Sequence, residues 1–169
     1  MRRVTLVLGG ARSGKSRHAE GLAAIHAERT YIATAEVTDA EMQDRIARHR
    51  AQRGDGWMTV EAPLDLAGAL ADARGFVLAD CITVWIGNLM HHGEDVPAAL
   101  DRLIRVLERH EARIVIVSNE VGLSIVPENA MARQFRDLQG IANQRLAEVA
   151  DEVIFVAAGL PLVLKSPVR

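Results

Sequence analysis

The stretch Gly9-Gly10-Ala11-Arg12-Ser13-Gly14-Lys15-Ser16 follows the apolar run Val4–Leu8 and precedes a segment with a helical pattern. The spacing Gly-x-x-x-x-Gly-Lys-Ser between a strand and a helix is typical of a phosphate-binding P-loop. Glycines let such a loop turn its amide N–H groups inward around a phosphate, and the helix start adds its positive dipole end. We therefore expect all eight residues to bind a nucleotide.

Two residues of this loop have specific expected roles. Lys15 should reach the β- and γ-phosphates, and the Ser16 hydroxyl should bind Mg²⁺. The alternative is a glycine-rich turn that contains Lys-Ser by chance. The chain has only two lysines, Lys15 and Lys165, so a lysine at this position favours the nucleotide-binding interpretation.

Short apolar runs alternate with helical patterns along the rest of the chain. Strands are predicted at Val4–Leu8, Tyr31–Ala33, Met58–Val60, Phe76–Ala79, Ile114–Val117 and Val153–Val156. Helices are predicted at Ser16–Ala27, Ala40–Arg53, Leu64–Ala73, Thr83–Met90, Pro97–Glu111 and Met131–Ala150. This alternation predicts an α/β protein, a single domain over residues 1–169 with a mainly parallel sheet flanked by helices.

Polar residues follow several of the predicted strands. They are the P-loop, Thr34-Ala35-Glu36, Asp80 and Ser118-Asn119-Glu120. Ligands of such sheets bind beyond the carboxyl ends of the strands, so these residues should converge on one rim. The same residues could instead be simple strand caps.

Asp80 ends the apolar run Phe76–Ala79 and has two possible roles. An acidic residue after a hydrophobic strand is what a Walker-B position needs to hold Mg²⁺. Aspartate is also a favoured N-cap, and a helix is predicted to begin near Ile82. The P-loop already requires a Mg²⁺ partner, which favours the metal role.

Composition limits the classes of function. The 169 residues are 49% hydrophobic and carry a net charge of −2, so no basic surface argues for nucleic acid. Cys81 is the single cysteine, which excludes an intramolecular disulfide. The run Val4–Leu8 is too short for a secretory signal, and no segment approaches the length of a membrane span. We therefore expect a cytoplasmic protein that acts on small molecules.

The helix predicted around residues 41–53 places Met42, Arg45, Ile46, His49 and Arg53 on one face. In the simpler interpretation this is an amphipathic helix with a structural histidine at its margin. The arginines also offer a second interpretation, because guanidinium groups fit phosphate oxygens and could bring a phosphate to a nucleophilic imidazole. The residues alone favour the structural role.

Several segments together resemble one known family. They are GGARSGKSRHAE (9–20), YIATAE (31–36), EMQDRIARHR (41–50), WMTVEAP (57–63), LADCITVWIGNLM (78–90), the long block VSNEVGLSIVPEN…LAEVAD (117–151) and GLPLVLK (159–165). In this order they resemble the bifunctional adenosylcobinamide kinase/adenosylcobinamide-phosphate guanylyltransferases of cobalamin biosynthesis. The resemblance covers nearly the whole chain and implies a RecA-like P-loop fold.

The resemblance implies two reactions. ATP or GTP phosphorylates the aminopropanol hydroxyl of adenosylcobinamide, and GTP then donates GMP to adenosylcobinamide-phosphate through a GMP-histidine intermediate. The family's histidine follows Arg-Ile by three residues, which makes His49 the expected nucleophile and not His18. Matching by the same motifs places Thr34, Ala35, Glu36, Arg50, Ala51, Gln52, Arg53 and Glu61 around the guanine nucleotide and Asp80 at the acidic position. The family also implies a homo-oligomer, a trimer.

Two other functions remain open on the sequence alone. One is a P-loop kinase with a single activity and a structural His49. The other is a non-catalytic module gated by a nucleotide. Asn119 and Glu120 likewise remain open, since they can bind or orient the corrinoid or serve a turn.

Overall fold

Seven strands form one sheet in the order β3-β2-β4-β5-β1-β6-β7. The computed structural model describes residues 3–37 and 40–166, without the side chains of residues 40, 41, 45 and 52. The strands are β1 (Arg3–Gly9), β2 (Arg29–Ala33), β3 (Met58–Glu61), β4 (Phe76–Asp80), β5 (Arg113–Asn119), β6 (Glu152–Ala157) and β7 (Leu160–Lys165). All neighbouring pairs are parallel except β6 and β7, which confirms the predicted α/β fold.

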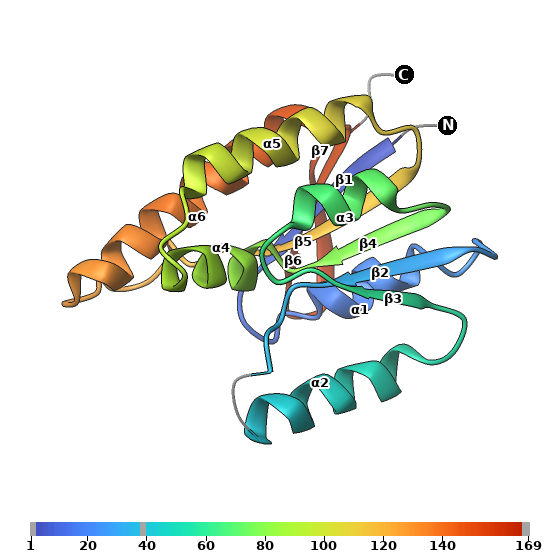
Figure 1. Ribbon diagram of the computed structural model, residues 1–169, viewed down its shortest axis with the longest axis horizontal. Helices are drawn as coiled ribbons and strands as arrows, with labels where there is room; N and C mark the ends of the chain where they lie inside the picture. The colour runs from blue at the N-terminus through green and yellow to red at the C-terminus, as the bar shows by residue number, and fades with distance from the viewer. Residues whose placement is uncertain (1–2, 38–39, 167–169) are drawn as a thin grey trace.

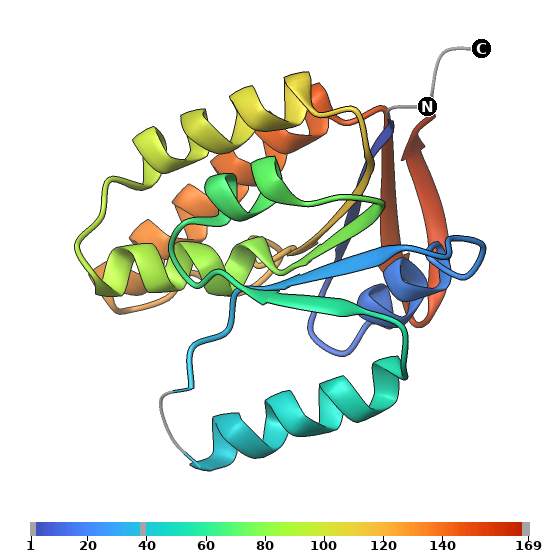
Figure 2. The same cartoon turned by 45° about the vertical axis from the view of Figure 1, so that its right-hand side comes forward.

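Helices cover both faces of this sheet (Figures 1 and 2). They are α1 (Lys15–Gly21), α2 (Ala40–Arg53), α3 (Leu66–Asp72), α4 (Ile82–His91), α5 (Val96–Arg109) and α6 (Ala130–Val149). Helices α3 to α6 form a layer on one face, and α1 packs on the opposite face against β1, β4, β5 and β6. Helix α2 lies beyond the β2–β3 edge, apart from both layers (Figure 2).

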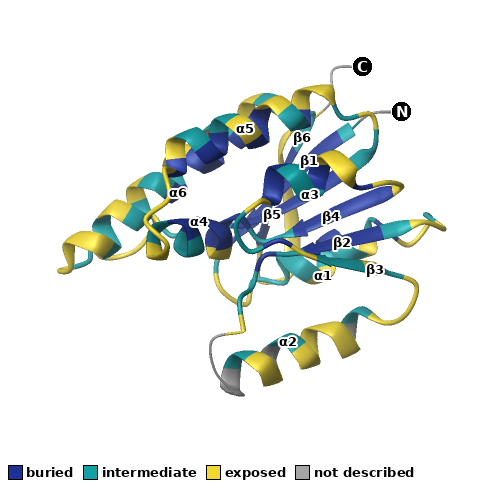
Figure 3. Cartoon of the chain, in the orientation of Figure 1, coloured by how far each residue is buried: buried dark blue, intermediate teal, exposed yellow. Residues whose placement is uncertain are grey.

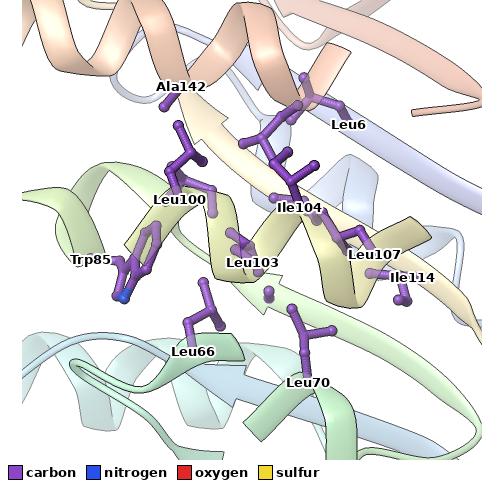
Figure 4. Close-up of a cluster of buried hydrophobic side chains, with 14 of the residues drawn as sticks. Leu6, Leu66, Leu70, Trp85, Leu100, Leu103, Ile104, Leu107, Ile114 and Ala142 are labelled. Carbon is purple, nitrogen blue, oxygen red and sulfur yellow. The ribbon is translucent and has the colours of Figure 1, made fainter. Parts of the chain in front are cut away.

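Helix α5 shows how local sequence builds the larger core. The Asp95 side chain caps its start by accepting a hydrogen bond of 2.9 Å from the Ala98 amide. Apolar residues then recur at intervals of three and four and form one buried face: Val96, Ala99, Leu100, Leu103, Ile104 and Leu107. In Figure 4 this face meets Leu66 and Leu70 of α3 and Trp85 of α4. This packing fixes the helical layer above β4 and β5.

The structure differs from the predicted elements in two places. The helix expected over residues 16–27 ends at Gly21, because the amides of Leu22, Ala23 and Ala24 bond to carbonyls three residues back, in tighter turns. Strand β7 was not predicted. It pairs with β6 through a turn in which Ala158 and Gly159 have φ of 52° and 78°, a geometry suited to a two-residue hairpin.

Candidate nucleotide site

The P-loop begins where β1 ends, between β5 and β6. A Cβ atom on Gly9 would collide with the Ser13 hydroxyl and lie 2.6 Å from the Val156 carbonyl oxygen. Gly14 has φ of 94°, and a Cβ there would lie 3.2 Å from Cα of Gly159. Both positions therefore require glycine for a physical reason. The amide of Gly159 also donates a 2.8 Å hydrogen bond to the Ser13 carbonyl, which ties the loop to the β6–β7 turn.

Lys15 is folded back over its own loop. Its Nζ donates a 3.3 Å hydrogen bond to the Gly10 carbonyl oxygen, and α1 begins at Lys15 itself. The lysine therefore spans the loop at the position where a phosphate would sit. Ser16 follows in the first turn of α1 and is half-buried. These positions have the geometry of a phosphate cradle.

Asp80 lies at the carboxyl end of β4 and does not cap a helix. Cys81 takes the cap position of α4, where its Sγ accepts from the Val84 amide at 3.5 Å. The Asp80 carboxylate instead accepts a 3.1 Å hydrogen bond from the Tyr31 hydroxyl. The cap interpretation of Asp80 is therefore wrong, and its carboxylate is bonded to Tyr31 of β2.

Tyr31 joins Asp80 to the end of α2. The Arg53 guanidinium lies 3.4 Å from the centroid of the Tyr31 ring and donates a 3.1 Å hydrogen bond to the Thr59 hydroxyl. Burial raises the pKa of Tyr31 strongly, and the negative charge of Asp80 adds to this effect. Tyr31 therefore remains a hydrogen-bond donor to Asp80 at all working pH values.

Glu20 of α1 belongs to the same charged cluster. Burial raises its pKa, the negative charge of Asp80 raises it further, and the positive charge of Arg53 lowers it. The α1 helix that follows the P-loop thus brings a carboxyl group toward Asp80.

The segment after β2 is held firmly at the same rim. Thr34 is buried, and its Oγ1 accepts from the Cys81 amide and donates to the Cys81 carbonyl, both at 2.9 Å. The Asn88 amide group donates to the Thr34 carbonyl at 2.7 Å. Ala35 follows, and Glu36 pairs with His92 at 3.0 Å. Thr34 therefore fixes the backbone of Cys81, the residue that follows Asp80, at this rim.

Helix α2 carries the remaining predicted residues away from the cradle. His49, Arg50 and Ala51 are exposed on α2, which Figure 3 shows largely open to solvent. Among the residues that the structure describes, His49 has no hydrogen bond or ion pair with the P-loop. The side chain of Gln52 lies outside the described residues. The structure thus brings Arg53 to Asp80 through Tyr31 and leaves His49 in solvent.

Glu61 ends β3 and is exposed at the outer edge of the sheet. The strand register sets it beside Ala33, so Glu61 and the Thr34–Glu36 segment share one end of the β2–β3 pair. This arrangement fits a surface that extends from the cradle toward α2.

The oxygen donors near the cradle suit a hard cation that also binds phosphate. Ser16 supplies a hydroxyl and Asp80 a carboxylate, while no group of three or more His, Cys, Asp or Glu side chains among the described residues could hold a metal ion. Mg²⁺ commonly takes only one or two protein carboxylates and completes its shell with substrate phosphates and water. The donor set therefore fits Mg²⁺ held together with a nucleotide.

Sequence reasoning missed Tyr31 and Asn88 as residues that organise the site. Tyr31 is the only tyrosine of the chain, and Asn88 lies inside an apolar helical segment. Both features were visible in the sequence. Their partners were not, because Asp80 and Thr34 lie 49 and 54 residues away along the chain.

The Cys81 thiol should react slowly in the folded protein. Burial, reinforced by the charge of Asp80, raises its pKa to about 11. At pH 8 about one thiol in 1000 is then ionised, against about one in four for a free cysteine of pKa near 8.5. Because the thiolate is the nucleophile, alkylation by iodoacetamide should be roughly 250-fold slower in the folded chain than in urea. Equal rates of alkylation would contradict this expectation. Because Cys81 is the single cysteine of the chain, all alkylation of thiols is assigned to it.

Comparisons with known proteins show the family to which the sequence is similar. The CobU model, described as cobinamide kinase / cobinamide phosphate guanyltransferase, matches residues 5–164. The chain is 46% identical to the bifunctional adenosylcobalamin biosynthesis protein CobP of Pseudomonas aeruginosa, over 95% of this chain and 96% of that protein. It is 44% identical to CobU of Salmonella typhimurium, over 95% of this chain and 98% of that protein.

Solved structures are similar in fold at low sequence identity. An ATPase of a bacterial type III secretion system matches with a TM-score of 0.56 and 13% identity, over 96% of this chain and 57% of its own. A protein of Pyrococcus horikoshii matches with a TM-score of 0.53 and 10% identity, over 97% and 86%. These likenesses concern the fold alone and agree with the predicted P-loop architecture. Within the described residues, no helix has both the length and the apolar character needed to cross a membrane.

Proposed function

Because the chain belongs to the CobU family of cobinamide kinases and cobinamide phosphate guanyltransferases, we propose that one nucleotide site serves both of its reactions. The chain is a bifunctional kinase and guanylyltransferase of cobalamin biosynthesis. The shared site rests on one observation: the P-loop follows β1 and Asp80 ends β4, and both strands flank β5, which pairs Asn119 with Gly9 and Val117 with Asp80. A P-loop lysine and a carboxylate at the same end of the sheet are the parts that phosphoryl transfer requires.

In the kinase reaction, the aminopropanol hydroxyl of adenosylcobinamide attacks the γ-phosphorus of ATP or GTP. The bond between the γ-phosphorus and the bridging oxygen breaks, and the nucleoside diphosphate leaves. Lys15 and the inward amides of Gly9–Gly14 offset the negative charge that develops on the phosphates. The folded-back position of Lys15 over Gly10 supports this role, because a bound phosphate replaces the carbonyl as its partner.

In the guanylyltransferase reaction, a nitrogen of the His49 imidazole attacks the α-phosphorus of GTP and pyrophosphate leaves. An oxygen of adenosylcobinamide-phosphate then attacks the same phosphorus, the P–N bond breaks, and adenosylcobinamide-GDP forms. A covalent intermediate divides one difficult transfer into two easier displacements. The exposure of His49 supports the proposal, because the imidazole is open to a nucleotide and to an acceptor in turn.

Ser16 and Asp80 would hold Mg²⁺ together with the nucleotide phosphates. When bound, this ion supplies charge that stabilises the departing phosphate oxygens. Tyr31 fixes the Asp80 carboxylate by its 3.1 Å hydrogen bond, and Arg53 fixes the Tyr31 ring. These contacts fix the position of the carboxylate at the end of β4.

The surroundings of the guanine nucleotide are proposed to be the rim beside β2 and β3. The residues are Thr34, Ala35, Glu36, Arg50, Ala51, Gln52, Arg53 and Glu61. The hydrogen bonds that anchor Thr34, and the register that places Glu61 beside this segment, support a surface between the cradle and α2. Arginines on α2 offer guanidinium groups for phosphate oxygens.

We also propose a cytoplasmic homo-oligomer, a trimer. Strand β7 forms one edge of the sheet, and its apolar residues Leu160, Leu162, Val163 and Leu164 are each at least half exposed. An apolar sheet edge of this kind is typically covered by another chain. Sedimentation velocity tests the trimer, since a monomer of 18.4 kDa would contradict it.

The proposed function is tested by incubating the protein with GTP, Mg²⁺ and adenosylcobinamide and analysing products by mass spectrometry. We expect addition of a phosphate first and then of GMP, with neither product in EDTA. Phosphate addition alone would favour a kinase with a single activity. Neither product with Mg²⁺ present would favour a nucleotide-gated module without catalysis.

A further inference from the structure

A cavity opens beside the P-loop, on the side opposite the β2–β3 rim. Its volume is about 410 Å³, and it is lined by Gly10 and Ala11 of the loop, by Asn119 and Glu120 after β5, and by Phe155 of β6. Val121, Leu123 and Ser124 complete the lining. The wall is thus largely apolar, with one carboxylate near the loop, which suits an organic substrate that reacts at a polar end.

The Glu120 carboxylate is placed next to the cradle by the strand order. Strand β5 lies between β1 and β4, and the register sets Asn119 beside Gly9. The Glu120 amide donates a 3.1 Å hydrogen bond to the Gly9 carbonyl. Its Oε1 accepts a hydrogen bond from the Gly122 amide, which fixes the carboxylate in the loop. Glu120 therefore extends from the strand that separates the P-loop from Asp80.

A buried polar network holds the backbone that carries Glu120. Gln139 and Asn143 of α6 bond to each other and to the Ser118 hydroxyl at 2.7 to 2.9 Å. Asn143 donates to the Asn119 carbonyl at 3.0 Å, and the Asn119 amide donates to the Thr83 hydroxyl at 2.8 Å. These hydrogen bonds hold the backbone at Asn119, although the side-chain oxygens of Gln139 and Asn119 are buried without a hydrogen-bond partner. The residue before Glu120 is thus fixed on both its amide and its carbonyl.

The cavity adjoins the residue of the P-loop that Lys15 contacts. Gly10 lines the cavity, and its carbonyl accepts the hydrogen bond from Lys15, the residue that reaches the β- and γ-phosphates in a P-loop. A substrate in this cavity would therefore present its polar end to the γ-phosphoryl group. Glu120 lines the same space.

The two reactions place different demands on this carboxylate. A kinase acceptor is a hydroxyl, which must lose a proton as it attacks phosphorus. The acceptor of GMP is a phosphate that is already ionised and has no proton to lose at neutral pH. A base is therefore needed for the first reaction and is idle in the second.

We propose that Glu120 is the general base of the kinase reaction, an inference that rests on the proposed function. As the hydroxyl oxygen bonds to the γ-phosphorus, its proton passes to a carboxylate oxygen of Glu120. The bond from the γ-phosphorus to the bridging oxygen breaks, and its electron pair leaves on the nucleoside diphosphate. The cavity between Glu120, Gly10 and Phe155 holds the hydroxyl end of the corrinoid substrate during this step.

Glu120→Gln tests the inference, because glutamine keeps the length of the side chain and can still accept from Gly122 but cannot take the proton. Phosphorylation of adenosylcobinamide should fall by about 100- to 10,000-fold. GMP transfer, measured separately with GTP and supplied adenosylcobinamide-phosphate, should stay within about twofold. Glu108→Gln, on the exposed face of α5, is the matched control and should leave both rates unchanged.

Phosphorylation by Glu120→Gln within about threefold of the unaltered enzyme would overturn the inference and leave the proposed function intact. An equal loss of both reactions would also overturn it, because a base for the hydroxyl has no part in GMP transfer. Failure of the unaltered protein to phosphorylate adenosylcobinamide would instead contradict the proposed function, and the inference with it. Retained GMP transfer also shows that the variant is folded.

Discussion

His49→Ala should abolish GMP transfer to adenosylcobinamide-phosphate and leave phosphorylation of adenosylcobinamide within about threefold. The substitution removes the atom that forms the P–N bond, so the covalent route has no nucleophile. Phosphoryl transfer uses the P-loop, Asp80, the acceptor and the proposed base Glu120, and none of these depends on the imidazole of His49. His49 lies on α2, which stands apart from the helical layers, and its loss removes no packing from the core.

The covalent intermediate gives this prediction a direct readout. GTP labelled on the α-phosphate should leave an acid-labile GMP adduct on the unaltered protein and none on His49→Ala. His18→Ala is the matched control, since His18 lies on α1 beside the cradle and should not be needed for the adduct. GMP transfer at the normal rate by His49→Ala, or a normal adduct on that variant, would show that the covalent mechanism is wrong.

The position of His49 implies that α2 and the bound nucleotide must approach each other before the histidine can react. Its imidazole is exposed on α2, while the P-loop proposed to bind the phosphates leads into α1. The α-phosphate and the imidazole must meet for the P–N bond to form. The contact of Arg53 with Tyr31 and Thr59 anchors the end of α2 that lies nearest the sheet, so this end is fixed while His49 lies four residues before it.

The parts of the site that could be predicted are those encoded locally. The P-loop is a run of eight residues between a strand and a helix, and its pattern can be read without the contacts that Gly9 and Gly14 make with the distant Val156 and Gly159. The β4 run predicted the position of Asp80 for the same reason. Apolar strands and capped helices gave the fold class because each pattern is complete within about fifteen residues.

The parts that could not be predicted depend on which strands become neighbours. Tyr31 reaches Asp80 because the register sets Ala33 beside Asp80, which puts Tyr31 and Asp80 on one face of the sheet. No short-range pattern reports that register. Strand β7 was missed for a different reason: its sequence LPLVLK does not alternate between apolar and polar residues, and Pro161 inside the run argues against a central strand.

Lys15→Ala should impair both reactions, each by at least about 100-fold. The Lys15 ammonium group carries a full positive charge and donates a hydrogen bond to the Gly10 carbonyl of the P-loop. With a nucleotide bound, it should stabilise the negative charge on the leaving phosphates. Nucleoside diphosphate leaves in one reaction and pyrophosphate in the other, and both carry the β-phosphate that Lys15 reaches. Loss of Lys15 therefore raises both barriers.

Lys165→Ala is the matched control, because it removes the only other lysine of the chain. Lys165 bonds to the carbonyls of Ala147 and Glu148 at the end of α6, so its loss costs about 0.5 to 1.5 kcal/mol of stability and touches no phosphate. Rates of both reactions should be unchanged in this control below its unfolding temperature. Lys15→Ala with lost phosphorylation and normal GMP transfer would mean that the two reactions use separate nucleotide sites. Equal loss of both reactions would instead indicate that they share one nucleotide site, because a single ammonium group would then stabilise two different leaving groups.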